Sequence, residues 1–141
     1  MNGFLLDTNC ISELVRPRPD RHVLAWVDST EEALLYLSVL TLGEIRRGVA
    51  VLTVGRRRTQ LESWLTLELL ARFSGRVLAI DKAIADKWGW LSAEARRRGR
   101  PLAVIDGLLA ATALQFDLTI VSRNVADFGA TQVKLLNPWD T

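Results

Sequence analysis

Short apolar runs alternate with segments of helical spacing along the whole chain, and this alternation restricts the possible folds most. The runs are Phe4–Leu6, Leu34–Ser38, Val77–Ile80, Leu118–Val121 and Val133–Leu136. Between them, apolar residues recur every three or four positions, as on the buried face of a helix. Strands that alternate with helices form a parallel sheet that is covered on both faces. The sequence therefore predicts an α/β fold, an αβα sandwich around a central, mainly parallel sheet of four to five strands.

Residues at the ends of the helical segments fix their expected bounds. We expect helices over Cys10–Val15, Asp20–Asp28, from Thr41 onward, Arg56–Phe73, from Asp81 to about Arg98, and Val104–Phe116. Asp7-Thr8-Asn9 and Asp81 offer N-cap chemistry, and Gly75 and Gly99 follow helix ends. The chain has 141 residues, which predicts a single domain over 1–141.

Composition excludes several classes of protein. The single cysteine, Cys10, permits neither an intramolecular disulfide nor a thiolate zinc site. The N-terminus lacks the basic and apolar regions of a signal peptide, and the longest apolar stretch, from Ala33 to Gly43, is too short to span a membrane. We therefore expect a soluble, cytoplasmic protein without membrane contact.

Three acidic residues stand out because their surroundings are apolar. Asp7 is the only charged side chain before Ser12, Glu44 ends the uncharged stretch, and Asp106 is the only charge between Pro101 and Gln115. Burying a lone carboxylate is costly unless it is paired or binds a metal. The predicted topology places Asp7 at the carboxyl end of the first strand, which is where ligands bind in open α/β sheets.

The helices that carry Glu44 and Asp106 can point both acids at the same crevice as Asp7. Oxygen ligands of this kind suit Mg²⁺ or Mn²⁺, which activate water for phosphodiester cleavage. Each acid also has a purely structural interpretation. Asp7 can cap a helix, Asp106 can interact with a helix dipole, and Glu44 can pair with Arg47.

Four segments in order resemble the PIN-domain ribonucleases, specifically the VapC-type toxins of type II toxin–antitoxin pairs. They are residues 5–9 (LLDTN), 38–48 (SVLTLGEIRRG), 106–113 (DGLLAATA) and 121–128 (VSRNVADF). The ending 136–139 (LNPW) is similar to the FitB-like subgroup. The resemblance implies a PIN-domain-like fold and a Mg²⁺- or Mn²⁺-dependent endoribonuclease. It also implies a homodimer that is held inactive by a VapB-type antitoxin and assembles with it on operator DNA.

By the same resemblance, Asp7, Glu44 and Asp106 match the three catalytic, metal-binding acids of the family. A fourth acid is common after the fourth strand, where this chain has Asn124; Asp127, three residues later, is the expected substitute. Supporting roles at the acids are expected for Thr8, Asn9 and Ser122.

Arginines provide the candidate RNA contacts. One basic cluster joins Arg46-Arg47 with residues 56–58, and another joins residues 96–98 with Arg100. Arg46 and Arg47 flank Glu44 and are the better candidates, together with Arg123. Solvated helix ends are the alternative explanation of both clusters.

Other functions fit less well. Gly43 and Gly48 have P-loop spacing, but Val49 follows where a P-loop needs Lys. A phosphoaspartyl phosphatase needs a second Asp where Asn9 stands, and a phosphoreceiver domain needs adjacent acids at the end of the first strand. Two alternatives stay open: a DNA-directed nuclease, and a non-catalytic interaction module that Asn124 favours.

Overall fold

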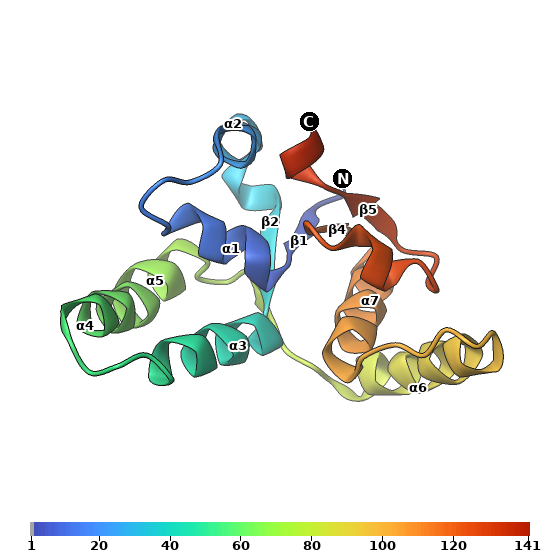
Figure 1. Cartoon of the computed structure of the whole chain (residues 1–141). Coiled ribbons are helices and arrows are strands. Elements are labelled where there is room, and N and C mark those ends of the chain that lie inside the picture. The colour runs from blue at the N-terminus through green and yellow to red at the C-terminus, as the bar shows by residue number, and fades with distance from the viewer. Residues whose placement is uncertain (1) are drawn as a thin grey trace.

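Five parallel strands form one sheet at the centre of the molecule, in the order β3-β2-β1-β4-β5. A computed structural model describes residues 2–141 of the chain. The strands are β1 (Phe4–Leu6), β2 (Leu35–Ser38), β3 (Val77–Leu78), β4 (Thr119–Val121) and β5 (Lys134–Leu136). Figure 1 shows the sheet between two groups of helices. The α/β sandwich with a parallel sheet is confirmed.

Helices connect the strands. They are α1 (Thr8–Leu14), α2 (Arg21–Ser29), α3 (Val39–Ala50), α4 (Arg56–Ser63), α5 (Leu70–Arg72), α6 (Lys82–Arg97) and α7 (Val104–Phe116). Shorter turns are the 3₁₀ segments η1 (Glu32–Leu34), η3 (Val125–Phe128) and η4 (Pro138–Asp140), and the π-helical segment η2 (Trp64–Leu69). None of the helices within residues 2–141 combines the length and apolarity that crossing a membrane requires.

Alternate residues of the strands enter two different hydrophobic cores. Leu6 and Val121 are buried against α1, α2, α3 and the helical stretch from α4 to α5, whereas Leu5 and Ile120 are buried against α7. Side chains alternate between the faces of a strand, so the two cores lie on opposite sides of the sheet. The α6 helix packs on α7 and completes the second layer (Figure 1).

The structure differs from the sequence prediction at two elements. The third strand has only two residues, because its partner β2 ends at Ser38, which pairs with Leu78 and caps α3. The helix expected over Arg56–Phe73 contains the π-helical segment η2. Its core-facing residues recur every four positions, at Leu61, Leu65, Leu69 and Phe73. A regular α-helix would rotate such a series off the core, and a wider turn keeps it aligned.

Candidate active site

Asp7 lies where β1 ends and α1 begins. Its backbone amide donates to the Val121 carbonyl at 2.9 Å, which ties it to the neighbouring strand β4. Its carboxylate accepts hydrogen bonds from the Thr8 amide (2.8 Å) and from the Ser122 hydroxyl (2.8 Å). Asp7 is therefore the N-cap of α1, as the structural interpretation expects. The residue is only 9% exposed, and these hydrogen bonds hold its side chain at the edge of the sheet.

A polar network joins the start of α1 to the segment after β4. The fully buried Ser122 hydroxyl accepts hydrogen bonds from Asn9 Nδ2 (3.2 Å) and from the Asn124 amide (3.0 Å). Asn9 Oδ1 accepts one from the Arg123 amide at 3.2 Å. Asn9 and Ser122 thus position the two backbone segments on either side of Asp7.

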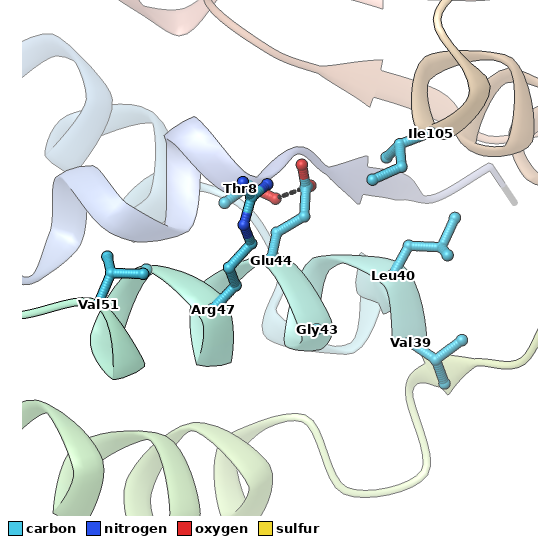
Figure 2. Close-up of a pocket in the computed structure, with 9 residues that line it drawn as sticks. Thr8, Val39, Leu40, Gly43, Glu44, Arg47, Val51 and Ile105 are labelled. Carbon is cyan, nitrogen blue, oxygen red and sulfur yellow. Dashed lines mark hydrogen bonds between the residues drawn. The ribbon is translucent and has the colours of Figure 1, made fainter.

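Glu44 comes from α3, which begins immediately after β2. The Thr8 hydroxyl donates a hydrogen bond to Oε1 of Glu44, and Figure 2 shows the two side chains pointing toward each other. This bond places the second acid beside the first, because Thr8 directly follows Asp7. The expected alternative, an ion pair of Glu44 with Arg47, is not found among residues 2–141.

Asp106 lies in the first turn of α7, on the other side of the site. Its partial burial, together with the negative charges of Asp7, Asp127 and Glu44, raises its pKa from 3.8 to about 6. Asp7, Asp127 and Glu44 are thus near enough to Asp106 to act on it electrostatically.

The donor set at this edge of the sheet consists of oxygen atoms. Within residues 2–141, no three His, Cys, Asp or Glu side chains converge into a complete metal site. Neighbouring carboxylates repel one another, and a cation bound between them relieves that repulsion. A hard divalent cation fits the oxygen donors of Asp7, Glu44, Asp106 and Asp127.

A groove of about 670 Å³ lies between α3 and the first turn of α7, with Glu44 on its wall. Figure 2 shows Leu40 and Val39 on the α3 side and Ile105 across from them. Arg47 also lines this groove, but the exposed Arg46 is not among its lining residues. The two neighbouring arginines, which the sequence analysis treats alike, therefore have different positions relative to the acids.

The other predicted residues occupy distinct places. Asn124 contributes its backbone amide to the Ser122 network, whereas Asp127 lines a second pocket together with Asp106. The Arg123 guanidinium stacks on the Trp139 ring at 5.5 Å. Sequence reasoning gave no separate role to Arg100, which also lines the second pocket. Its position six residues before Asp106 is the one feature of the sequence that could have indicated a place near this acid.

The known proteins that are similar to this chain belong to one family. Residues 4–132 match the PIN domain. The toxin FitB of Neisseria gonorrhoeae is 41% identical over 136 residues, which cover 96% of this chain and 98% of that protein. The VapC ribonuclease Y4jK of Sinorhizobium fredii is 39% identical over 137 residues, covering 97% of this chain and 98% of its own length.

A solved structure agrees with these sequence matches. The structure of FitAB bound to an IR36 DNA fragment superposes with a TM-score of 0.92 at 39% identity, and it covers 96% of this chain and 95% of that one. The match of PIN-domain sequence, fold and nearly complete length confirms the resemblance seen in the motifs. The chain belongs to the PIN-domain family and, within it, to the VapC-type toxins of the FitB-like subgroup.

Proposed function

We propose that this chain is the toxin of a VapBC-type toxin–antitoxin pair and acts as a Mg²⁺- or Mn²⁺-dependent endoribonuclease. The observation that carries this proposal is the position of three acids at the carboxyl edge of a parallel sheet: Asp7 at the end of β1, Glu44 joined to it through Thr8, and Asp106 in the first turn of α7. The name of the relative Y4jK, a VapC ribonuclease, supports RNA as the substrate.

Asp7, Glu44 and Asp106 would hold the cation, with Asp127 as a further acid and Asn124 only as a neutral neighbour. When bound, Mg²⁺ or Mn²⁺ supplies Lewis-acid activation of water and stabilises negative charge on the phosphodiester. Asp7 is positioned for this role by Ser122 and by the cap of α1, and Glu44 by Thr8. The acids nearest α1 are thus fixed before substrate arrives.

The chain's own residues also prepare the attack on RNA. Glu44 Oε1 is occupied by the Thr8 hydroxyl, so we assign Oε2 to accept a hydrogen bond from the attacking water. The water oxygen forms a bond to phosphorus as its proton passes to Glu44 Oε2, the P–O3′ bond breaks, and the leaving 3′ oxygen takes up a proton from bulk water. The products carry 5′-phosphate and 3′-hydroxyl ends. Arg47, which lines the groove beside Glu44, is placed to contact an RNA phosphate.

The groove beside Glu44 also offers a binding surface for the proposed antitoxin. Apolar side chains of Val39, Leu40 and Ile105 line it next to Glu44, and Val39 is 39% exposed. A segment of a VapB-type antitoxin bound there would bury this apolar surface and cover the acid. The related FitAB structure contains DNA, so we extend the proposal to a homodimer that assembles with its antitoxin on operator DNA.

Cleavage by the purified chain tests the enzymatic proposal. Structured and unstructured RNA is incubated with Mg²⁺, Mn²⁺ or EDTA, beside the Asp106→Asn variant and with DNA as a competitor. We expect cation-dependent cleavage that the variant loses by about 1000-fold or more, since the variant removes one of three charged ligands. Asp117→Asn, which changes the exposed carboxylate at the opposite end of α7 from Asp106, serves as the control.

The ends of the products decide the mechanism. Ends that are 2′,3′-cyclic phosphates would exclude attack by water. Equal cleavage of DNA would favour the DNA-directed nuclease, and unaltered cleavage by Asp106→Asn would remove the proposed site.

Expression of the chain without its antitoxin is expected to stop growth, and expression of Asp106→Asn is not.

A further inference from the structure

Asp106 lacks the local supports that hold the other two acids. The carboxylates of Asp7 and Glu44 accept hydrogen bonds, whereas none reaches the carboxylate of Asp106 from residues 2–141. The helix that carries it, α7, begins after Ala103, whose side chain cannot cap the first turn. The place of this turn, and of Asp106 on it, must therefore be set by packing against other elements.

Trp88 of α6 makes a close packing contact at this turn. A Cβ atom on Gly107, the residue after Asp106, would lie 2.9 Å from Cδ1 and 3.0 Å from Nε1 of Trp88. Carbon atoms in contact are about 3.5–4.0 Å apart, so the indole leaves no room for a methyl group there. Gly107 lies inside α7 and is not one of the glycines with a positive φ. The indole, and not the backbone conformation, therefore requires a glycine at this position.

The indole ring has little freedom to move away from α7. Trp88 is half-buried between α6 and α7, which lie along each other (Figure 1). An aromatic side chain turns about only two bonds, so it cannot bend aside as a long flexible side chain does. The added Cβ atom on Gly107 would also lie 3.8 Å from the Cβ atom of Leu102, so a second side chain closes the space. The contact with Trp88 is therefore a rigid one.

The Nε1–H group of Trp88 is buried and has no hydrogen-bond partner among residues 2–141. A buried donor without a partner costs free energy, and a phenylalanine at this position would avoid that cost. The stability of the contact between α6 and α7 by itself thus gives no reason for an indole. What the indole adds is the five-membered ring that lies against the residue after Asp106.

The place of the first turn of α7 matters because a bound cation has a strict geometry. Mg²⁺ requires near-octahedral oxygen ligands at about 2.0–2.1 Å. Asp7 and Glu44 are linked to each other through Thr8. Asp106 has no such link, so a small displacement of α7 would change its distance from the other two acids. A contact that fixes this turn therefore fixes the third ligand.

We propose that Trp88 is a positioning residue for the cation site, because its indole sets the place of the first turn of α7 and hence of Asp106. This inference rests on the proposed function, since it concerns the site that would hold Mg²⁺ or Mn²⁺. It gives a role in cation binding to α6, which carries none of the proposed ligands.

Mn²⁺ binding to the whole chain tests this role without any measurement of cleavage. Free Mn²⁺ is followed by electron paramagnetic resonance during a titration, at a temperature where circular dichroism shows every variant to be folded. Trp88→Phe, which removes the five-membered ring, should raise the dissociation constant by about threefold to tenfold, as loss of an outer-shell partner does. Trp90→Phe is the matched control, because Trp90 is on the same helix but 66% exposed, and it should bind as the parent chain does.

Alanine substitutions test the contact from the side of α7. Gly107→Ala forces the first turn away from the indole and should weaken Mn²⁺ binding by about tenfold or more. Gly89→Ala is the matched control, because no atom lies within 4 Å of a Cβ added at this exposed position of α6. Alanine favours a helix equally at both positions, so the difference between the two variants reports the contact with Trp88.

A double variant distinguishes positioning from simple packing. Trp88→Leu/Gly107→Ala places a smaller side chain opposite the added methyl group, and it should bind Mn²⁺ more tightly than Gly107→Ala alone. Substitutions in contact with each other are not additive when one relieves the clash of the other. If Trp88 only stabilises the fold, the two substitutions should lower the melting temperature and leave Mn²⁺ affinity unaltered.

The outcomes separate this inference from the proposed function. The inference is overturned if Trp88→Phe binds Mn²⁺ as tightly as the parent chain, if Gly89→Ala loses as much affinity as Gly107→Ala, or if the double variant gains nothing. Should Gly107→Ala not fold, Trp88→Phe and its control decide alone. A parent chain that binds no Mn²⁺ refutes the cation site and this inference together. The expected pattern of Mn²⁺ binding without RNA cleavage would refute the nuclease and leave the positioning role intact.

Discussion

The acids on the two sides of the site are held in opposite ways. On the side of α1 and α3, Asp7 accepts hydrogen bonds from the Thr8 amide and the Ser122 hydroxyl, and Glu44 accepts one from the Thr8 hydroxyl. On the side of α7, no hydrogen bond from residues 2–141 lowers the pKa of Asp106, and burial and neighbouring carboxylates raise it to about 6. One side is stabilised by hydrogen bonds, and the other is destabilised by burial and by the repulsion of neighbouring carboxylates.

This difference predicts unequal effects of the same substitution on stability. Asp7→Ala should lower the free energy of unfolding by about 2–3 kcal/mol, because it removes the N-cap of α1 and the acceptor of the buried Ser122 hydroxyl. Urea unfolding followed by circular dichroism measures this. Asp106→Ala, the matched truncation on the other side, should cost far less. Equal losses for the two variants would contradict the comparison.

Ser122→Ala tests whether the network, and not Asp7 alone, stabilises the first side. Ser122 is fully buried and makes three hydrogen bonds, with Asp7, Asn9 and the Asn124 amide. Its loss should reduce the unfolding free energy by about 2 kcal/mol and leave Asp7 less fixed. Ser122→Thr keeps the hydroxyl and serves as the control. If both variants unfold at the urea concentration of the parent chain, the network does not stabilise the fold.

Asp106→Asn should raise the free energy of unfolding in EDTA at about pH 7.5 by about 1 kcal/mol. The gain is this modest because solvent screens part of the repulsion at this partly exposed carboxylate. The folded pKa of about 6 exceeds the ordinary 3.8, so the folded state keeps this proton where the unfolded state releases it. The contribution of this carboxyl to stability therefore falls as the pH rises through that window.

Thermal unfolding at several pH values checks the sign of this effect. The advantage of Asp106→Asn should be full above about pH 6 and vanish near about pH 4. Added Mg²⁺ should raise the melting temperature of the parent chain more than that of the variant, since a ligand stabilises the state that binds it. A variant that is less stable than the parent at pH 7.5 would show that Asp106 is not under repulsion.

Thr8→Val should have the smallest effect on folding and a larger one on cleavage. It removes the only hydroxyl among residues 2–141 that donates to Glu44 but preserves the shape of the side chain. We expect a loss of about 0.5–1 kcal/mol in unfolding free energy. Cleavage should fall about tenfold or more, because Glu44 is then free to leave its position. Thr8→Ser, which keeps the hydroxyl, should retain most of the activity, and an equally inactive Thr8→Ser would assign the loss to packing instead.

Much of the fold follows from local sequence. Apolar runs and helical spacing locate the strands and helices, since each element must bury its own apolar face. The π-helical segment η2 was not predicted, because only the core on which Leu65 and Leu69 pack makes a wider turn favourable. The end of β3 at Leu78 depends likewise on its partner β2, which no local pattern along residues 77–80 reveals.

The candidate acids were also predicted from sequence, because Asp7, Glu44 and Asp106 are isolated charges in apolar stretches. Asp127 lacks such a signal, and only the structure places it in one pocket with Asp106. The arginines show the same limit. Arg46 and Arg47 are adjacent in sequence, but only Arg47 lines the groove with Glu44, because successive residues of a helix point in different directions.

The sequence by itself determined which residues are costly to bury and where strands and helices begin, since both depend on side chains a few positions apart. The tertiary structure decided which carboxylates carry hydrogen bonds and which repel one another. It also decided that Arg100 lies against Gly129 beside Asp106, while Arg97 and Arg98 pair with Glu94. Those outcomes depend on distances between segments far apart in the chain, and only the packing of α7, η3 and the sheet sets these distances.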